Sequence, residues 1–326
     1  MTKWNEYNSK YVDGKCFVPV TFPYNKPDGI LLENLNLDDL IDYVQKKQIK
    51  KAYIEEMTNY DFLRVCQPLE HITIEFKPSF SEYSRCIQIG NKIIKEYDLT
   101  SLYTLKHLKS LSMGENTPDF VKVKVHVDLS QIPSLEKLST QYEYVKNIDS
   151  LKKLKTLGLN NVKLPDLHGL FYGDELDTLD IGFSSIESLD GIETAPKMQY
   201  VKLLYNRKLK DINALGKVKN TLKTLRIENC PKIQNFSVLT ELENLELLEI
   251  YGSNTLPSLN FIKSMKNLKT FVFNVNVEDG DLSPCLNLSY VYSEKNRKHY
   301  NLKDKDLPKD AYIRGNEDIE EWRRLE

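Results

Sequence analysis

The sequence has few of the residues that metal, nucleotide and catalytic sites use. Its five histidines are scattered, its five cysteines never occur as CxxC, and its 13 glycines are mostly isolated. No HExxH, GxSxG or glycine-rich phosphate loop occurs. We therefore expect no metal, no cofactor and no catalytic residues, and we predict that the protein is not an enzyme.

The sequence also lacks a long apolar run and an excess of one charge. No stretch approaches the roughly 20 apolar residues of a membrane span, and charges interrupt the N-terminus where a signal peptide needs an apolar core. With 45 basic and 47 acidic residues, the net charge of −2 predicts no general attraction to nucleic acid or to a membrane. These features favour a cytoplasmic protein with reduced thiols. At 326 residues the chain can form one extended domain or two ordinary ones.

The sequence is rich in repetition. The stretch from Leu176 to Leu215 has the same spacing of apolar residues twice, 22 residues apart, in the frame LxxLxLxx(N/C/S). Clear copies of the frame begin at Leu108, Leu135, Leu154, Leu176, Met198, Leu222, Leu245, Leu268 and Leu288, and weaker copies begin at Ile49 and Leu69. We count ten or eleven units, because the span from Leu69 to Leu108 holds either a degenerate repeat or an insertion.

Each unit predicts a strand followed by a turn. The LxLx part alternates apolar and polar residues, as a short strand with one buried face does, and the three-residue apolar spacing that follows fits a 3₁₀ or α turn. One unit cannot bury its own apolar face, so neighbouring units must stack into a continuous core. The ninth position of the frame should turn inward and pair buried backbone groups. In seven units this position is small and polar or a cysteine: Asn116, Ser184, Asn206, Cys230, Ser253, Asn276 and Asn296. In two other units it is Glu143 and Val162, which do not fit the pattern.

These copies resemble leucine-rich repeats of the short bacterial type, over about Ile49 to Leu302. The resemblance implies an α/β solenoid with a curved parallel β-sheet on its concave face and 3₁₀ or α turns on its convex face. It also implies that a partner binds on the concave face.

Three regions follow from this interpretation. Residues 1–48 are predicted to form an N-terminal cap, with strand and turn near residues 16–29 and an amphipathic helix near Asn34–Gln48. Residues 49–302 are predicted to form the repeats. Residues 303–326 are predicted to form a capping tail whose short helix starts at Asn316 and docks Trp322 on the last repeat.

The frame also predicts which side chains face a partner. Positions 1, 4 and 6 should point into the core, positions 3, 5 and 7 onto the concave face, and positions 2 and 8 along its rims. Clustered aromatic residues mixed with charge are typical of contact sites, although stacking along a parallel sheet also favours aromatic residues. The predicted partner-binding residues are Tyr142, Asp180, Phe183, Lys202, Tyr205, Arg226, Glu228, Glu249 and Tyr251. A group of acids near the N-terminal repeats is either a docking site for a basic partner or solvated surface; it comprises Glu55, Glu56, Glu70 and Glu75.

We therefore predict a cytoplasmic protein-binding scaffold, monomeric on its own, that grips one protein partner. The lysine-rich, arginine-poor composition is typical of bacteria, and by analogy the partner is a toxin or enzyme and the protein its immunity partner or inhibitor. The alternative is an internalin-like effector or adhesin that acts on a host protein. An enzyme with a site in the first 48 residues, or between Leu69 and Leu108, is a third class, but no polar cluster supports it.

Overall fold

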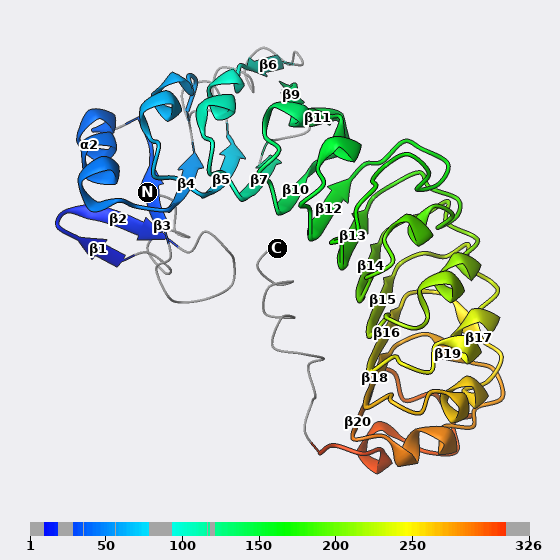
Figure 1. Cartoon of the computed structure of the whole chain (residues 1–326). Helices are drawn as coiled ribbons and strands as arrows, with labels where there is room; N and C mark the ends of the chain where they lie inside the picture. Colours follow the sequence, from blue (N-terminus) through cyan, green and yellow to red (C-terminus); the bar gives the residue numbers. More distant parts are fainter. Residues whose placement is uncertain are drawn as a thin grey trace. The chain divides into compact units, whose positions relative to one another are not determined.

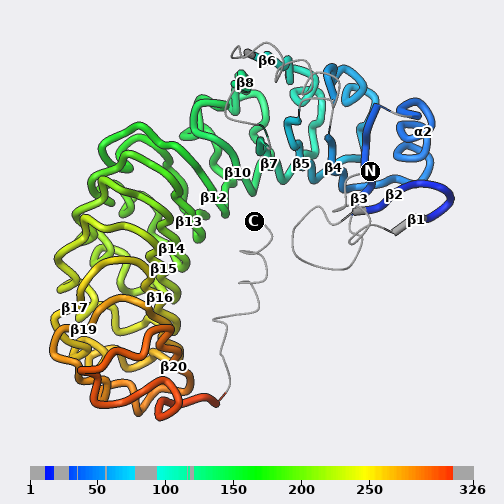
Figure 2. The backbone as a smooth tube through the Cα atoms, turned by 180° about the vertical axis from the view of Figure 1, so that it is seen from behind, coloured from blue at the N-terminus to red at the C-terminus, as the bar shows by residue number. Residues whose placement is uncertain are grey.

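The structure, a computed structural model, describes residues 10–18, 29–34, 36–55, 57–77, 93–115, 117 and 121–310. The chain divides into two compact units between Leu154 and Lys155. Each unit has its own run of parallel strands, and Figures 1 and 2 show these strands lying side by side with the helical turns on the other side.

Unit 1 contains a sheet that starts with an antiparallel hairpin and continues as parallel strands. In spatial order its strands are β1 (Lys10–Val12), β2 (Lys15–Val18), β3 (Gly29–Leu32), β4 (Lys51–Glu55), β5 (His71–Phe76), β7 (Ser110–Glu115) and β10 (Lys137–Gln141). Two small sheets lie apart from it, one of β6 (Ile93–Tyr97) with β8 (Val121–Val125) and one of β9 (Val127–Asp128) with β11 (Val145–Lys146). Because β5 pairs directly with β7, the span from Leu69 to Leu108 adds no further strand to the main sheet among the residues described.

Unit 2 contains the more regular repeats. Its parallel strands are, in order, β12 (Thr156–Asn160), β13 (Thr178–Gly182), β14 (Tyr200–Leu204), β15 (Thr224–Glu228), β16 (Leu247–Tyr251), β18 (Thr270–Phe273) and β20 (Tyr290–Ser293). A separate pair joins β17 (Thr255–Leu256) to β19 (Asn276–Val277). Each repeat therefore pairs with the repeats before and after it.

Helical turns connect the strands. One α-helix, α2 (Leu37–Lys47), precedes the first repeat, and 3₁₀ helices follow most strands. In unit 1 these are η1 (Asp61–Val65), η2 (Thr100–Thr104), η3 (Leu129–Gln131), η4 (Tyr142–Tyr144) and η5 (Ile148–Ser150). In unit 2 they are η6 (Ile192–Thr194), η7 (Asn213–Val218), η8 (Ser237–Glu241), η9 (Asn260–Ser264), η10 (Ser283–Asn287) and η11 (Asp304–Asp306). The segment between β12 and β13 contains no 3₁₀ helix.

The strands confirm the fold class that the sequence predicts, a leucine-rich repeat solenoid. In every frame, including the weaker ones at Ile49 and Leu69, the strand begins at position 3 and ends at position 7 or one residue before or after it. The inward positions form the core, and Leu157, Leu179 and Leu225 are completely buried. Apolar area removed from water at about 25 cal/mol per Å² is the main stabilising contribution.

The ninth position behaves as predicted in only part of unit 2. Ser184, Asn206 and Cys230 are buried there. Asn206 accepts a hydrogen bond from the Ser184 backbone N–H at 3.0 Å and donates one to the Ile181 carbonyl at 2.8 Å. The assignment of Ser253 is wrong, because Ser253 is exposed and the next residue, Asn254, turns inward and donates to two carbonyl groups.

Other ninth positions differ as well. Asn276 is half-buried in β19 and Asn296 is exposed, so neither fills the inward site. In unit 1 the chain buries Tyr144 rather than the ninth residue Glu143, and the Tyr144 hydroxyl donates to Glu115 at 2.9 Å. Asn116 lies outside the described residues. The frame therefore specifies the strands better than it specifies the turns that follow them.

The predicted N-terminal helix is present as α2, with Leu40 and Val44 buried and Leu37 and Ile41 half-buried. Much of the predicted strand-and-turn segment near residues 16–29 lies outside the described residues. The predicted C-terminal helix with Asn316 and Trp322 also lies outside them. The division into cap, repeats and tail stays a prediction.

Lysines neutralise the acids of the N-terminal repeats. Lys77 Nζ lies 2.5 Å from Glu55 and 3.3 Å from Glu75, and Glu55 is buried. Glu70 pairs with Lys109 at 2.6 Å and with Lys50 at 2.8 Å. Glu56 lies outside the described residues. Because the acids that are described have cationic partners, this part of unit 1 offers no excess of free carboxylates to a basic partner.

Glu70 should make unit 1 sensitive to acid. Hydrogen bonds from Lys109 and then Lys50 lower the pKa of Glu70 to about 2, from 4.5. A carboxyl with a lowered pKa in the folded state contributes stability that is complete above pH 4.5 and is lost as the pH falls towards 2. We expect the difference in melting temperature between the wild type and Glu70→Gln to be largest near neutral pH and to vanish as the pH falls through this range. A difference that is constant with pH, or one equal to that of the exposed-site control Glu96→Gln, would contradict the assignment.

Candidate functional site

The outward face of the unit 2 sheet carries most of the predicted site. The strand register places position 5 of successive repeats in one row and position 7 in a second row. The first row reads Gly158, Asp180, Lys202, Arg226, Glu249, Val272 and Tyr292, and the second reads Asn160, Gly182, Leu204, Glu228 and Tyr251. The structure therefore brings the predicted charged residues together as neighbours on adjacent strands.

Lys202 departs from the exposure expected of an outward position. Its side chain is only 1% exposed, and its Nζ lies 3.3 Å from an Asp180 carboxylate oxygen on the adjacent strand. Arg226 adjoins it on the other side in the register. A lysine buried in this way is paired within the fold, so the expectation that Lys202 meets a partner directly is wrong.

Arg226 forms the centre of a second charged group. One of its terminal nitrogens lies 2.9 Å from Glu228, and its Nε lies 3.5 Å from Glu249. The guanidinium also lies over the Tyr251 ring, 5.8 Å from its centroid. The two carboxylates hold the planar guanidinium in a fixed orientation. The one cation offsets one of the two carboxylate charges, so the group carries a net charge of −1, and Glu249 is nearly buried.

Phe183 and Tyr205 form an exposed aromatic pair at the edge of this face. Their rings lie parallel, at an angle of 3° and with centroids 5.0 Å apart. Phe183 is 56% exposed and Tyr205 is 36% exposed, so both keep much of their surface in water. We call these two residues the aromatic pair. They are the predicted site residues with the largest apolar exposure in unit 2.

The backbone conformation at the aromatic pair is costly. Phe183 and Tyr205 both have φ of +53°, in the left-handed region that residues with a side chain rarely adopt. They occupy the eighth position of the frame. The same position in neighbouring repeats holds Asn161, Asn229 and Gly252, with φ of +59°, +52° and +136°. Asparagine and glycine are the residues that best tolerate positive φ.

A hydrogen-bond ladder explains why this position is left-handed. The Phe183 N–H donates to the Leu204 carbonyl at 2.8 Å, and the Tyr205 N–H donates to the Glu228 carbonyl at 2.8 Å. Asn161 and Asn229 make the same bond to the next repeat. The turn thus extends the hydrogen bonding between strands by one residue before the chain enters the core at position nine. The left-handed backbone therefore recurs at position eight of four successive repeats, and only the side chain at that position varies.

The backbone cost at the aromatic pair exceeds the gain from stacking its two rings. A left-handed conformation costs an ordinary residue about 1–2 kcal/mol, and two such residues therefore cost about 2–4 kcal/mol. Stacking of two aromatic rings contributes about 0.5–1.5 kcal/mol. At both positions the left-handed backbone would cost an asparagine less free energy than it costs these aromatic residues, and the aromatic side chains stay partly in contact with water. Backbone strain of this kind is typical of functional sites.

The remaining predicted site residue belongs to the other unit. Tyr142 opens η4 in unit 1 and is half-buried, whereas the other eight residues belong to unit 2.

Cys230 behaves as the turn residue that the sequence predicts. Burial raises the pKa of its thiol to about 11, which disfavours the nucleophilic thiolate.

Three further cations follow the left-handed position and were not among the predicted site residues. Arg207, Lys208 and Lys232 are exposed and form no ion pair among the residues described. They lie in the segments that follow β14 and β15, just beyond the left-handed position. The frame of nine residues ends before them, which is why they were overlooked. A count of charge at positions 10 and 11 of each repeat would have revealed them.

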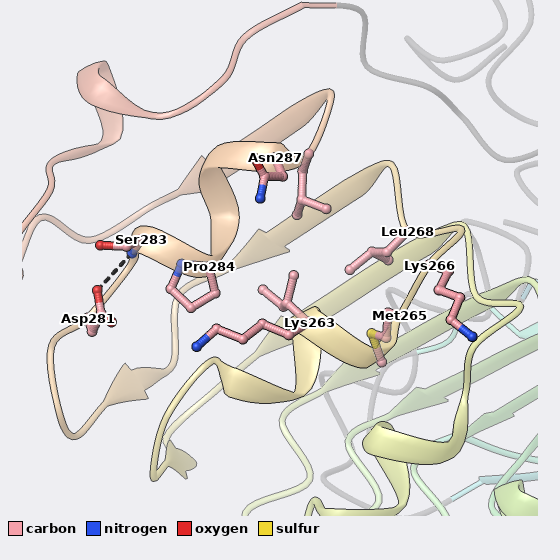
Figure 3. A pocket seen from close by; sticks show the side chains of 10 residues that line it. Lys263, Met265, Lys266, Leu268, Asp281, Ser283, Pro284 and Asn287 are labelled. Atoms are coloured by element: carbon pink, nitrogen blue, oxygen red, sulfur yellow. Dashed lines mark hydrogen bonds between the residues drawn. The ribbon is translucent and has the colours of Figure 1, made fainter.

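A pocket of about 370 Å³ lies between η9 and η10, and Figure 3 shows side chains that line it. Its charged groups have partners in the fold. Lys263 donates to Asn260 at 2.7 Å, Lys266 pairs with Glu243 at 2.8 Å, and Asp281 accepts from the Ser283 N–H at 2.9 Å. These three groups are therefore not free to orient a ligand, and we regard the pocket as a gap between two repeats.

The described residues offer neither a metal site nor a membrane span. Across the described ranges, no three histidine, cysteine, aspartate or glutamate side chains gather as metal ligands would. None of the helices in the part of the chain that the structure describes has the length and apolar character needed to span a bilayer.

The known proteins named below are similar to this chain at low sequence identity. No family model matches the chain. A putative F-box/LRR-repeat protein of Arabidopsis thaliana is 25% identical over 240 residues, which cover 67% of this chain and 72% of that protein. Among solved structures, an internalin of Listeria monocytogenes gives a TM-score of 0.49 at 14% identity and covers 85% of this chain and 95% of that one. A leucine-rich repeat protein of Leptospira interrogans gives 0.36 at 14% identity, covering 82% of each chain.

Such distant similarity does not tell which molecule this chain binds. The fold is identified from the chain itself, because the frames recur along the sequence and their strands pair in register. Solenoids of this kind present extended surfaces that serve protein recognition. The chain thus has a leucine-rich repeat fold.

Proposed function

We propose that the protein is a binding scaffold that holds a protein partner through the aromatic pair on unit 2. The observation that carries this proposal is the combination of exposure and strain at Phe183 and Tyr205. Interfaces are enriched in aromatic anchors that become fully buried when the partner docks. The adjoining Arg226 group supplies fixed polar contacts, because its ion pairs hold the guanidinium in place before binding.

The charged sheet-face residues take a supporting role in this proposal. Asp180 fixes Lys202, and Glu228 and Glu249 fix Arg226, so the sheet beside the aromatic pair is held rigid by paired charges. A rigid surface loses less conformational entropy on binding than a mobile one. Tyr251, half-buried beside Arg226, extends the apolar surface away from the pair.

The kind of partner stays a prediction. A small repeat protein with a preformed, rigid face suits inhibition of a single protein, such as a toxin that the cell must neutralise in its cytoplasm. The alternative is an internalin-like effector or adhesin that acts on a host protein. Secretion of the chain into culture medium would favour the alternative, and retention within the cell with one co-purifying protein would favour the inhibitor.

The double substitution Phe183→Asn with Tyr205→Asn tests the proposed function. We expect a melting temperature equal to or above that of the wild type, since asparagine tolerates the left-handed conformation better. We also expect loss of the partner in affinity capture from the source cells, by more than about tenfold in recovered protein, because truncation of a buried anchor costs about 2 kcal/mol or more. Quantitative mass spectrometry of the captured protein measures the loss.

The matched control is Tyr172→Asn, which changes an aromatic residue of unit 2 that is 47% exposed in the segment joining β12 to β13. It should capture as well as the wild type. Two results would count against the proposal. One is a double variant that captures the partner normally, and the other is a double variant that unfolds, which would show that the pair serves the core.

A further inference from the structure

The segments beyond the aromatic pair form a cationic rim. Two acids, Glu187 and Asp211, and four cations, Arg207, Lys208, Lys210 and Lys232, lie there, which gives a local charge of +2. Lys210 pairs with Glu187 at 2.6 Å. The other three cations remain exposed and without an ion pair in the described part of the chain.

The register brings these cations to neighbouring repeats: Lys208 and Lys232 each lie four residues beyond the paired Leu204 and Glu228, and the Lys210 N–H donates to the Glu187 carbonyl at 3.0 Å. Hydrogen bonding and attraction from Lys210 lower the pKa of Glu187, and Lys208 and Lys232 contribute through their charge. Lys208 follows β14 and Lys232 follows β15, so cations of two neighbouring repeats act on one carboxylate. A single carboxylate cannot neutralise three lysines. Positive potential therefore remains at the rim for a partner to meet.

The sheet face offsets this rim charge only in part. Its three acids, Asp180, Glu228 and Glu249, all contact one of two cations, Lys202 and Arg226, which leaves a charge of −1 against the +2 of the rim. The balance of charge next to Phe183 and Tyr205 is thus positive. Complementary potentials steer association and set which partner fits.

We propose that this rim docks an acidic segment of the partner protein. In this arrangement an apolar side chain of the segment packs against Phe183 and Tyr205, and carboxylates of the segment lie opposite Arg207, Lys208 and Lys232. The inference rests on the proposed function and adds the chemistry of the partner to it.

Single-stranded nucleic acids also bind to surfaces of basic and aromatic residues. The geometry of the aromatic pair nevertheless favours a protein as the partner. The two rings stack on each other at 5.0 Å, close to the spacing of neighbouring strands. Their facing surfaces are therefore occupied, and a base cannot insert between them. Packing against the exposed ring edges suits an aliphatic or aromatic side chain.

A random dodecapeptide display library provides a test in which the partner itself need not be identified. The library is selected on the full chain at low ionic strength and then depleted on the Phe183→Asn/Tyr205→Asn variant, so that only peptides dependent on the aromatic pair remain. We expect these peptides to carry net negative charge and at least one aromatic or aliphatic residue. The affinity of the best peptide should fall as salt is added, because exposed charges are screened.

Charge reversal then tests the rim directly. Lys208→Glu with Lys232→Glu should weaken binding of the selected peptide by at least about tenfold, and Lys208→Gln with Lys232→Gln should weaken it less. The matched control is Lys295→Glu with Lys298→Glu, which reverses two exposed lysines elsewhere in unit 2 and should change affinity by less than about twofold. Thermal melts of the variants show whether each is folded.

The outcomes separate this inference from the proposed function. Pair-dependent peptides that are basic or neutral overturn the acidic segment and leave the scaffold function standing. Failure to recover any pair-dependent peptide counts against both. Tighter pair-dependent binding of oligothymidylate than of the selected peptides assigns the rim to nucleic acid and overturns the inference.

Discussion

The free energy of unfolding is expected to fall by about 2–5 kcal/mol when Leu225 is replaced by alanine. Leu225 lies at an inward position of β15, between Val201 and Leu248 of the neighbouring strands, and is completely buried. Removing its side chain leaves a cavity that the flanking strands can close only in part. Each repeat is stabilised mainly by its neighbours, so one cavity weakens two interfaces. Urea denaturation measures the loss as a shift in midpoint at unchanged slope.

An exposed leucine supplies the control. Leu286 in η10 is 48% exposed, and Leu286→Ala should change the free energy of unfolding by less than about 0.5 kcal/mol. If Leu225→Ala were as mild as Leu286→Ala, the inward positions of the frame would be wrong, and the outward assignments of Arg226 and Glu228 would be wrong with them.

Asn206→Leu is the second change with a large expected effect. The leucine keeps the branching and the number of heavy atoms of the side chain, with bulkier methyl groups, and removes both of these hydrogen bonds. The Ser184 N–H and the Ile181 carbonyl would then be buried without their asparagine partner. An unsatisfied buried polar group costs about 1–3 kcal/mol, so two of them predict a loss of about 2–5 kcal/mol. The same urea measurement detects it.

Asn213→Leu is the matched control, because Asn213 is an exposed residue of η7 in the same unit. It should change stability by less than about 0.5 kcal/mol. Equal effects at the two positions would show that apolar substitution itself, rather than the lost hydrogen bonds, destabilises the repeat. Partner capture by Asn206→Leu below its melting temperature should be weakened as well, because Tyr205 precedes the altered turn.

The strands and the register of unit 2 could be predicted because they depend on local alternation alone. Leu179, Val201 and Leu225 align across β13, β14 and β15 as the frame requires. Period-two alternation decides which face a side chain takes. It does not decide how much of that side chain neighbouring strands cover. For this reason the frame placed Lys202 on the correct face and failed to predict that Asp180 would hold it buried.

The turns were harder to predict because a single inserted residue shifts them. After β16 the chain needs one more residue before it enters the core, so Asn254 takes the place that Cys230 takes one repeat earlier. The left-handed position did leave a signal in the sequence, since Asn161, Asn229 and Gly252 occupy it in other repeats. Asparagine and glycine at a fixed place in a repeat indicate positive φ. Phe183 and Tyr205 then stand out as exceptions.

The left-handed backbone at Phe183 and Tyr205 has a consequence for how this sequence changes over generations. The left-handed conformation costs asparagine and glycine less than it costs phenylalanine and tyrosine. Under the proposed function, partner binding is what opposes replacement at these two codons. We therefore expect them to be among the first to accept asparagine or glycine in a copy of the gene that no longer needs the partner.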